Sequence, residues 1–263
     1  MLRSMYSGIS GLKNFQTKLD VIGNNIANVN TYGFKKGRVT FKDTMSQTVS
    51  GASGATADKG GTNAIQVGLG SSLASIDNID TQGSAQTTNR TLDFSIEGDG
   101  YFVVKNGNQQ SYTRAGNFYL DQDGALVTSE GFKVLDIDEQ EITIPQNIVS
   151  FSIGQGGEIT GVDANGASDT IATIGVAKFT NPAGLTKAGN NTFQASANSG
   201  VLDIGTADTE GRGKLTSGRL EMSNVDLSEE FTDMIVAQRG FQANTRIITT
   251  SDEILQELVN LKR

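Results

Sequence analysis

Four residues in the middle of the chain have the spacing that comes closest to a known chemical site. Asp121, Asp123, Gly124 and Glu130 fall on positions 3, 5, 6 and 12 of an EF-hand calcium loop, which binds its cation through oxygen ligands. Position 1 would be Tyr119, which has no carboxylate, and the flanking segments have the composition of strands, whereas an EF-hand loop joins two helices. We therefore interpret this segment as a β-hairpin turn.

The rest of the sequence offers no arrangement for catalysis. The chain has no His and no Cys, which excludes His-activated nucleophiles and zinc sites of the usual ligands. Glu229 and Glu230 are adjacent, so on a helix they point about 100° apart and cannot flank one substrate bond. The segment GRGKLTSG at 211–218 lacks the Gly-Lys-Ser/Thr order of a phosphate-binding loop. We predict no catalytic residue, no cofactor and no metal site.

The charge is distributed unevenly along the chain. The formal net charge is −8, and Met1–Lys42 carries seven Lys or Arg residues against Asp20 alone, so this segment is +6 and the remainder −14. The acidic bulk opposes binding to nucleic acid or to anionic lipid. No run approaches the roughly 18 apolar residues that span a bilayer, and the N-terminus lacks the apolar stretch of a cleaved secretory signal. We expect no nucleic-acid partner and no membrane insertion.

The N-terminal segment has the pattern of a helix with a narrow apolar seam. Eight of nine positions spaced by 3.5 residues are apolar, and Gly8 is the exception: Met1, Met5, Gly8, Leu12, Phe15, Leu19, Ile22, Ile26 and Val29. The second half contains Gly23, Asn24, Asn25 and Asn28, whose helix propensities are poorer than that of Ala by about 0.5–1 kcal/mol each. This helix therefore needs a partner to be stable.

The C-terminal segment has a longer heptad pattern. Asp226 is a predicted N-cap with Glu229 as the return half of a capping box. One column repeats every seven residues at Leu227, Met234, Phe241, Ile248 and Leu255, and the second seam column is Phe231, Gln238, Thr245, Asp252 and Val259. The polar middle of the second column is expected to favour one register. A flanking column at Ile247, Ile254 and Leu261 widens the apolar face, which implies more than one neighbour.

The sequence between the two helical segments changes character twice. Residues 46–72 are rich in Gly, Ser, Ala and Thr and are expected to form an extended connector. Short β-type runs with Gly-containing turns then predict a mostly-β domain. We predict an α+β fold in which the terminal helices pair as a coiled-coil-like stalk, with four parts: a helix and signature segment at 1–43, a connector at 44–86, a β body at 87–222 and a heptad helix at 223–263.

Three long motifs resemble one protein family. LDVIGNNIANVNTYGFKKG at 19–37, with Gly23, Asn24, Asn25, Asn28, Gly33 and Phe34, resembles the N-terminal signature of bacterial flagellar rod and hook proteins. LDFSIEGDGYFVV at 92–104 and YTRAGNFYLDQDGALVTSEG at 112–131 resemble the body motif of the same axial family. The segment 223–263, with Ser223, Asn224, Gln238 and Arg239, resembles the C-terminal helix and is most similar to that of hook proteins.

The resemblance implies a structural role outside the cell, in the hook and basal body. It implies export through the flagellar type III apparatus without a cleaved signal peptide, and polymerisation into a hollow tube lined by the paired terminal helices. For a hook subunit the implied partners are many copies of itself, the distal rod protein, the hook-filament junction protein, the hook cap and the hook-length control protein. A flexible hook of this kind transmits motor torque to the filament as a universal joint.

Three alternatives to a hook subunit are weighed, one within the family and two outside it. The total length and the Gly-rich segment also fit a distal rod subunit, whereas the C-terminal motif favours the hook, which is our expectation from the sequence. A coiled-coil adhesin would need an anchor or signal that is not visible. An enzyme that acts on carbohydrate through paired carboxylates is disfavoured because the chain has no Trp and only 6% aromatic residues.

Overall fold

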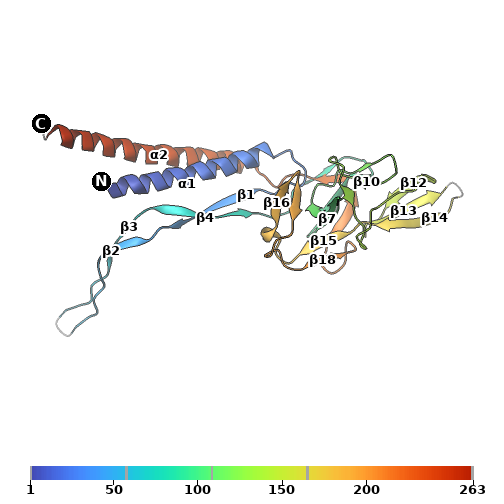
Figure 1. Ribbon diagram of the computed structural model, residues 1–263, viewed down its shortest axis with the longest axis horizontal. Coiled ribbons are helices and arrows are strands. Elements are labelled where there is room, and N and C mark those ends of the chain that lie inside the picture. The colour runs from blue at the N-terminus through green and yellow to red at the C-terminus, as the bar shows by residue number, and fades with distance from the viewer. Residues whose placement is uncertain (1, 57–58, 108, 164–165, 262–263) are drawn as a thin grey trace. The chain divides into compact units, whose positions relative to one another are not determined.

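The computed structural model describes residues 2–56, 59–107, 109–163 and 166–261, and it has a helix at each end with a mostly-β part between them (Figure 1). The predicted α+β class with paired terminal helices is confirmed. The chain divides into two compact units. The first comprises the residues up to Ala27, Gly37–Asp77 and the residues from Asp226 onward, and the second, which we call the body, comprises Asn28–Lys36 and Asn78–Val225.

The first unit is built on an antiparallel pair of helices. Helix α1 spans Leu2–Ala27 and α2 spans Leu227–Asn260. The side chain of Asp226 accepts a hydrogen bond from the Ser228 amide, so the predicted N-cap of α2 is confirmed. Lys18 Nζ lies 3.2 Å from Asp233 Oδ2 near the start of α2. Figure 1 shows the two helices side by side over much of their length.

Two β-ribbons complete the first unit. Strands β1 (Gly37–Asp43) and β4 (Ser71–Asn78) pair with each other, and β2 (Ser46–Ser50) pairs antiparallel with β3 (Ile65–Gly68). The phenyl rings of Phe15 and Phe41 lie 6.5 Å apart between α1 and β1. The expected connector at residues 46–72 therefore contains a pair of hydrogen-bonded strands, because backbone pairing does not require the apolar side chains that this segment lacks.

The body contains one large sheet and several smaller ones. The large sheet runs β16-β17-β8-β7-β11-β10-β9, and β15 pairs with both β7 and β18. A second sheet runs β12-β13-β14, and the pairs β19-β6 and β20-β5 bring segments near both ends of the body together. The bounds are β5 Ala85–Thr87, β6 Phe94–Glu97, β7 Tyr101–Asn106, β8 Gln109–Thr113, β9 Tyr119–Leu120, β10 Leu126–Val127, β11 Lys133–Val134, β12 Ile148–Ile153, β13 Glu158–Asp163, β14 Ser168–Thr173, β15 Val176–Phe179, the 3₁₀ turn Pro182–Gly184, β16 Thr186–Gly189, β17 Thr192–Gln194, β18 Leu202–Gly205, β19 Lys214–Ser217 and β20 Arg219–Glu221.

Strand β7 lies at the centre of the body and is buried on both faces. Its side chains alternate between two apolar clusters, with Phe102 and Val104 in one and Tyr101 and Val103 in the other. Phe102 packs edge-on against Phe118 with ring centroids 5.1 Å apart. A strand that is apolar at four successive positions therefore marks the middle of the body rather than a half-exposed edge.

The sequence-based interpretation of the segment around Asp121 is confirmed. Leu120 pairs with Leu126 and Tyr119 with Val127, which makes β9 and β10 a hairpin. Gly124 at its turn has φ of 79°, a conformation that glycine adopts without steric cost. Asp121 and Asp123 are therefore acidic residues of a solvent-exposed turn.

One predicted seam residue of the first helix lies outside it. Helix α1 ends at Ala27, so Val29 belongs to a turn in which the Thr31 amide donates to the Asn28 carbonyl oxygen. The apolar period runs past the helix because the half-buried side chain of Val29 belongs to the body instead. A period in sequence therefore does not by itself show where a helix ends.

Gly33 and Gly23 provide a matched pair of substitutions. Gly33 is buried with φ of 67°, and an added Cβ would lie 2.5 Å from the Arg114 carbonyl carbon, whereas a Cβ at Gly23 in α1 would meet nothing within 4 Å. We expect Gly33→Ala to destabilise the body by at least about 1–2 kcal/mol through left-handed strain alone. Gly23→Ala should instead stabilise α1 by about 0.8–1 kcal/mol. Urea unfolding followed by circular dichroism measures both effects, and a shift of the same sign in both variants would contradict this account.

Candidate assembly site

The contact between α1 and α2 is made through small residues. A Cβ on Gly240 would lie 2.5 Å from Cζ of Phe15, and one on Gly11 would lie 2.8 Å from Nδ2 of Asn244. One heptad column of α2 has small or polar members that are buried or half-buried: Glu230, Ala237, Asn244 and Ser251. Ile248, from the predicted first column, also lies against α1, at Gly8. At Gly11 and Gly240 the helices approach too closely for an added side chain.

This arrangement corrects the predicted second seam column of α2. Phe231, Gln238, Thr245, Asp252 and Val259 are all exposed, so they do not form the contact with α1 and cannot set its register. The buried polar column lies one residue earlier in the heptad. At Asn244 the physical reason is that Gly11 of α1, which has no Cβ, lies directly opposite.

The predicted assembly residues differ in how far the helix pair covers them. Ile22 is buried, and the half-buried residues are Leu12, Phe15, Leu19, Ile26, Met234, Ile248 and Leu255. Leu227, Phe231, Phe241 and Val259 are exposed, and so are the signature residues Gly23, Asn24, Gln238 and Arg239. The assembly role of these residues stays a prediction.

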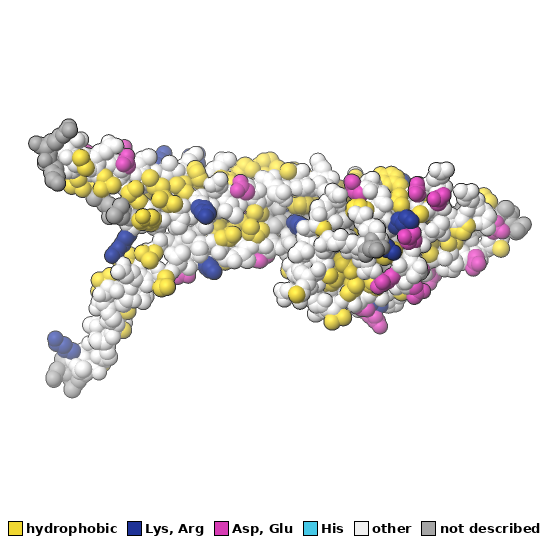
Figure 2. Space-filling model, in the orientation of Figure 1, with side chains coloured by type: hydrophobic (Ala, Val, Ile, Leu, Met, Phe, Trp, Pro, Cys, Tyr) yellow, Lys and Arg dark blue, Asp and Glu magenta, His cyan; other side chains and the backbone are white. Residues whose placement is uncertain are grey.

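Large apolar side chains remain on the surface of the first unit (Figure 2). Both helices and the β2–β3 ribbon contribute to this exposure, and Met45, directly before β2, is 85% exposed. The others include Tyr6, Ile9, Val49, Ile65, Phe231, Ile235, Val236, Ile254, Leu258 and Val259. An isolated two-stranded ribbon is at best marginally stable in water, and large exposed apolar patches mark interaction surfaces. The first unit thus has apolar surface that is available for contacts with other chains.

Asn25, from the predicted signature, joins three elements of the first unit. Its side chain is only 2% exposed, and Nδ2 donates to the Gly37 carbonyl oxygen at 2.9 Å and to Glu230 Oε2 at 3.2 Å. Its Oδ1 accepts a hydrogen bond from the Gly37 amide at 3.0 Å. The end of α1, the start of β1 and the first turn of α2 are therefore held by one amide group.

The remaining signature residues hold the start and the end of the body together. The Gly33 amide donates to the Glu221 carbonyl oxygen at 2.9 Å. Asn224 Oδ1 accepts from the Lys36 amide at 2.8 Å while its Nδ2 donates to the Ile79 carbonyl oxygen at 2.8 Å. Elsewhere in the signature, Lys187 Nζ lies 4.8 Å from the Phe34 ring centroid, Asn28 accepts from the Thr31 hydroxyl, and Ser223 is buried and accepts from the Val225 amide.

A buried ion cluster lies at this junction. Glu221 places Oε1 at 2.8 Å from Lys35 Nζ and Oε2 at 3.1 Å from Arg114 Nη1, and all three side chains are only 2% exposed. The Gly83 amide also donates to Oε1 at 3.0 Å. Asp80 is a weaker partner, with Oδ1 at 3.8 Å from Lys35 Nζ. Since buried charges are costly without partners, this cluster depends on the Glu221 carboxylate.

The surroundings shift two pKa values in the cluster. Burial, and then the nearby Arg114 cation, lowers the pKa of Lys35 below its ordinary 10.5, although Glu221 opposes the shift. Burial, and then the negative charge of Asp80, raises the pKa of Tyr101 well above 10.0. The Tyr101 hydroxyl donates to Asp80 Oδ2 at 2.8 Å, so its proton is held in place by the carboxylate.

Sequence reasoning did not identify this cluster. Glu221 is 107 residues from Arg114 and 186 from Lys35, so no local spacing connects them. The one local signal is Lys35 itself, a cation placed directly after Gly33 and Phe34 in the signature segment. Such a position could indicate a buried charge only if its partner were already known.

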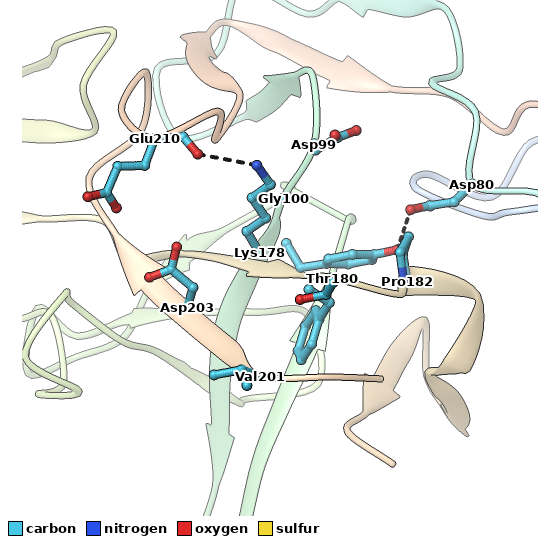
Figure 3. Close-up of a pocket in the computed structure, with 11 residues that line it drawn as sticks. Asp80, Asp99, Gly100, Lys178, Thr180, Pro182, Val201, Asp203 and Glu210 are labelled. Carbon is cyan, nitrogen blue, oxygen red and sulfur yellow. Dashed lines mark hydrogen bonds between the residues drawn. The ribbon is translucent and has the colours of Figure 1, made fainter. Parts of the chain in front are cut away.

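A cavity of about 500 Å³ in the body has four acidic residues in its lining, Asp80, Asp99, Asp203 and Glu210 (Figure 3). Most of these carboxylates already have internal partners. Arg212, which lies beside the cavity, contacts Asp203 Oδ2 at 2.6 Å and Glu210 Oε2 at 2.7 Å, and Tyr101 donates to Asp80. Lys178 Nζ donates to the Glu210 carbonyl oxygen at 3.2 Å. Most of the acidic side chains that line the cavity are therefore bound to other residues of the body.

Neither a metal cluster nor a membrane-spanning helix is found in the described part of the chain. Within it, no group of three or more His, Cys, Asp or Glu residues is arranged to hold a metal ion. No helix there is long and apolar enough to cross a membrane.

Comparison with known proteins places the chain in a family. Three family models match: "Flagella basal body rod protein" at residues 5–35, "Flagellar hook protein FlgE/F/G D1 domain" at 95–161 and "Flagellar basal body rod FlgEFG protein C-terminal" at 216–261. The flagellar basal-body rod protein FlgG of Bacillus subtilis is 60% identical over 264 residues, which covers all of both chains. The chain belongs to the flagellar rod and hook protein family.

More distant members of the family match over the whole chain as well. FlgG of Borreliella burgdorferi is 39% identical over 269 residues, and the flagellar hook protein FlgE of the same organism is 32% identical over 441 residues, with all of each chain covered in both cases. The homologues are structural flagellar proteins, and no catalytic family is indicated. This member of the rod and hook family is thus an axial, self-assembling part of the flagellum.

Replacing Glu221 tests the dependence of the body on its buried carboxylate. Glu221→Gln keeps the shape of the side chain but leaves the Lys35 and Arg114 cations without their closest anion, so we expect a loss of about 3–5 kcal/mol in the free energy of unfolding. Glu97→Gln removes a partly exposed carboxylate that pairs with Lys214 and Arg219, and should cost about 0–1 kcal/mol. Urea unfolding measures both, and equal losses would contradict the assigned role of Glu221.

The raised pKa of Tyr101 predicts a pH dependence of stability. Above pH 10 the unfolded chain loses this proton before the folded body does, so the folded state binds more protons and the free energy of unfolding falls as pH rises. Tyr101→Phe removes this contribution, so its stability should fall less steeply between about pH 9.5 and 11. The lowered pKa of Lys35 acts in the opposite direction in both proteins and cancels in the difference. Parallel profiles from urea unfolding would refute the prediction.

Proposed function

We propose that this chain is the distal rod subunit of the flagellar basal body, a component of the drive shaft, rather than the hook subunit expected from the C-terminal motif. The observation that carries the proposal is length. Relatives named as rod proteins match over 257–274 residues, close to the 263 residues of this chain. The two relatives named as hook proteins require alignments of 441 and 463 residues.

The difference in length corresponds to a large part of the hook relatives. An alignment of 441 positions against 263 residues leaves 178 positions without a counterpart in this chain, by subtraction. The Bacillus subtilis rod protein leaves almost none. The hook expectation rested on the residue pattern of the C-terminal helix. Rod and hook proteins share this pattern, because one family model describes the C-terminal region of both. The distal rod therefore replaces the hook as the favoured function.

The geometry supports a role in a polymer. The α1–α2 contact hides small residues and leaves Phe231, Ile235 and Leu258 among the exposed apolar side chains of α2. Complete burial of one such side chain contributes about 1.5–3 kcal/mol. Contacts with neighbouring copies over the helices and the β2–β3 ribbon would supply the free energy that the free subunit lacks, so ordering of this unit is coupled to assembly.

On this proposal the partners follow from position in the axis. The chain binds many copies of itself, other rod proteins on one side and the hook on the other, and reaches this place through the flagellar type III export apparatus. The junction protein, the hook cap and the hook-length control protein belong to the hook interpretation and are not expected to contact it.

Electron microscopy of basal bodies from cells that lack the protein tests the proposal. We expect the axial structure to stop within the rod, with hook and filament missing, because later subunits have no distal rod on which to assemble. Overproduced polymers of the protein should be straight and stiff. Intact rods that lack only the hook, or curved and supple polymers, would instead identify a hook subunit, and cells with normal flagella would exclude both functions.

A further inference from the structure

We propose that Glu221 is a folding gate, a residue without which the body cannot become compact and which is supplied late in the chain. Three residues distant in sequence meet at its carboxylate: Lys35, Gly83 and Arg114. The first two precede Glu221 by well over a hundred residues, and Glu221 itself lies 42 residues before the C-terminus, by subtraction from 263. The consequence for export rests on the proposed function, whereas the gate itself does not.

The gate arises because Lys35 and Arg114 are both buried in the compact body, whereas their main anionic partner, Glu221, is synthesised after both of them. Lys35 and Arg114 are both 2% exposed, and the proximity of Arg114 disfavours the charged form of Lys35. Among the described residues, Arg114 has no ion-pair partner other than Glu221. Asp80 lies 3.8 Å from Lys35 and accepts the Tyr101 proton, so it compensates one cation only weakly. A compact body without Glu221 would bury two poorly compensated charges, at a cost of several kcal/mol.

Residues 214–221, the segment that contains Glu221, also pair with two earlier strands around the cluster. Strand β20, which contains Glu221, pairs with β5, and β19 pairs with β6 through the register Leu215↔Ile96. Leu215 and Leu220 are buried. The ion cluster and the strand pairing therefore form at the same time. A compact state that forms without residues 214–221 would be unfavourable, because it would bury the charges of Lys35 and Arg114 without Glu221. During synthesis, which proceeds from the N-terminus, the body therefore stays unfolded until residues 214–221 have been made, and an unfolded body is suitable for threading through an export channel.

Refolding kinetics of the full-length protein from urea test the gate. Tyrosine fluorescence is a suitable signal because the chain has no Trp, and Tyr101 and Tyr112 are buried. If the Glu221 contacts must form before the body becomes compact, Glu221→Gln should slow folding by at least about tenfold and change the unfolding rate little. If Glu221→Gln speeds unfolding and leaves the folding rate unchanged, the cluster closes after the barrier and the gate is refuted.

A local ion pair serves as the matched control. Glu210 contacts Arg212, a 5% exposed cation only two residues away, so removal of its charge breaks an ion pair that needs no long-range closure. Glu210→Gln should leave the folding rate within about twofold of that of the parent protein. Equal slowing by Glu210→Gln and Glu221→Gln would mean that any lost carboxylate slows folding, and would also refute the gate.

An apolar replacement of the cluster keeps the proposal testable if Glu221→Gln does not fold. The triple variant Lys35→Met, Arg114→Met, Glu221→Leu removes the charges that must be compensated, and such replacements of buried ion clusters are often neutral or stabilising. It should fold at least as fast as the parent, and slower folding would overturn the proposal. These measurements need no polymer, so they are independent of whether the assembled protein proves to be rod or hook.

Discussion

A single carboxylate between two buried cations is the constraint on which the organisation of the body depends. Glu221 contacts Lys35 and Arg114 in a setting where none of the three side chains is more than 2% exposed. Each charge is tolerable only in the presence of the others, because desolvation costs far more than any one contact returns. The family signature around Gly33 and strand β20, which precedes α2, therefore both contribute to this ion cluster. The motif residues at opposite ends of the body are parts of one polar junction.

In the first unit the comparable constraint is steric. Gly11 and Gly240 let α1 and α2 approach so closely that a methyl group at either position would meet the opposite helix. The heptad pattern of α2 is consequently divided, with small and polar residues facing α1 and many large apolar residues facing outward. Asn25 then joins this pair to β1 through hydrogen bonds to the Gly37 backbone. A helix pair built this way leaves many of its large apolar side chains on the surface.

Local signals in the sequence predicted much of the fold. The terminal helices, the Asp226 N-cap and the glycine-containing turn at Gly124 are confirmed, because each depends on residues that are close in sequence. The pairing of β2 with β3 within the expected extended connector was not predicted, because backbone pairing needs no apolar side chains. Our proposal of a rod rather than a hook subunit rests on neither motif nor fold but on the lengths over which the relatives match.

The sequence by itself determined where helices and turns form and to which family the chain belongs, since periodicity, capping and motifs are properties of neighbouring residues. Only the tertiary structure showed that the column Glu230, Ala237, Asn244 and Ser251 faces α1, because that choice depends on glycines in another helix. It also showed that Glu221 meets Lys35 across 186 residues. The partner of a buried charge is set by how the whole chain folds, and no pattern of adjacent residues carries that information.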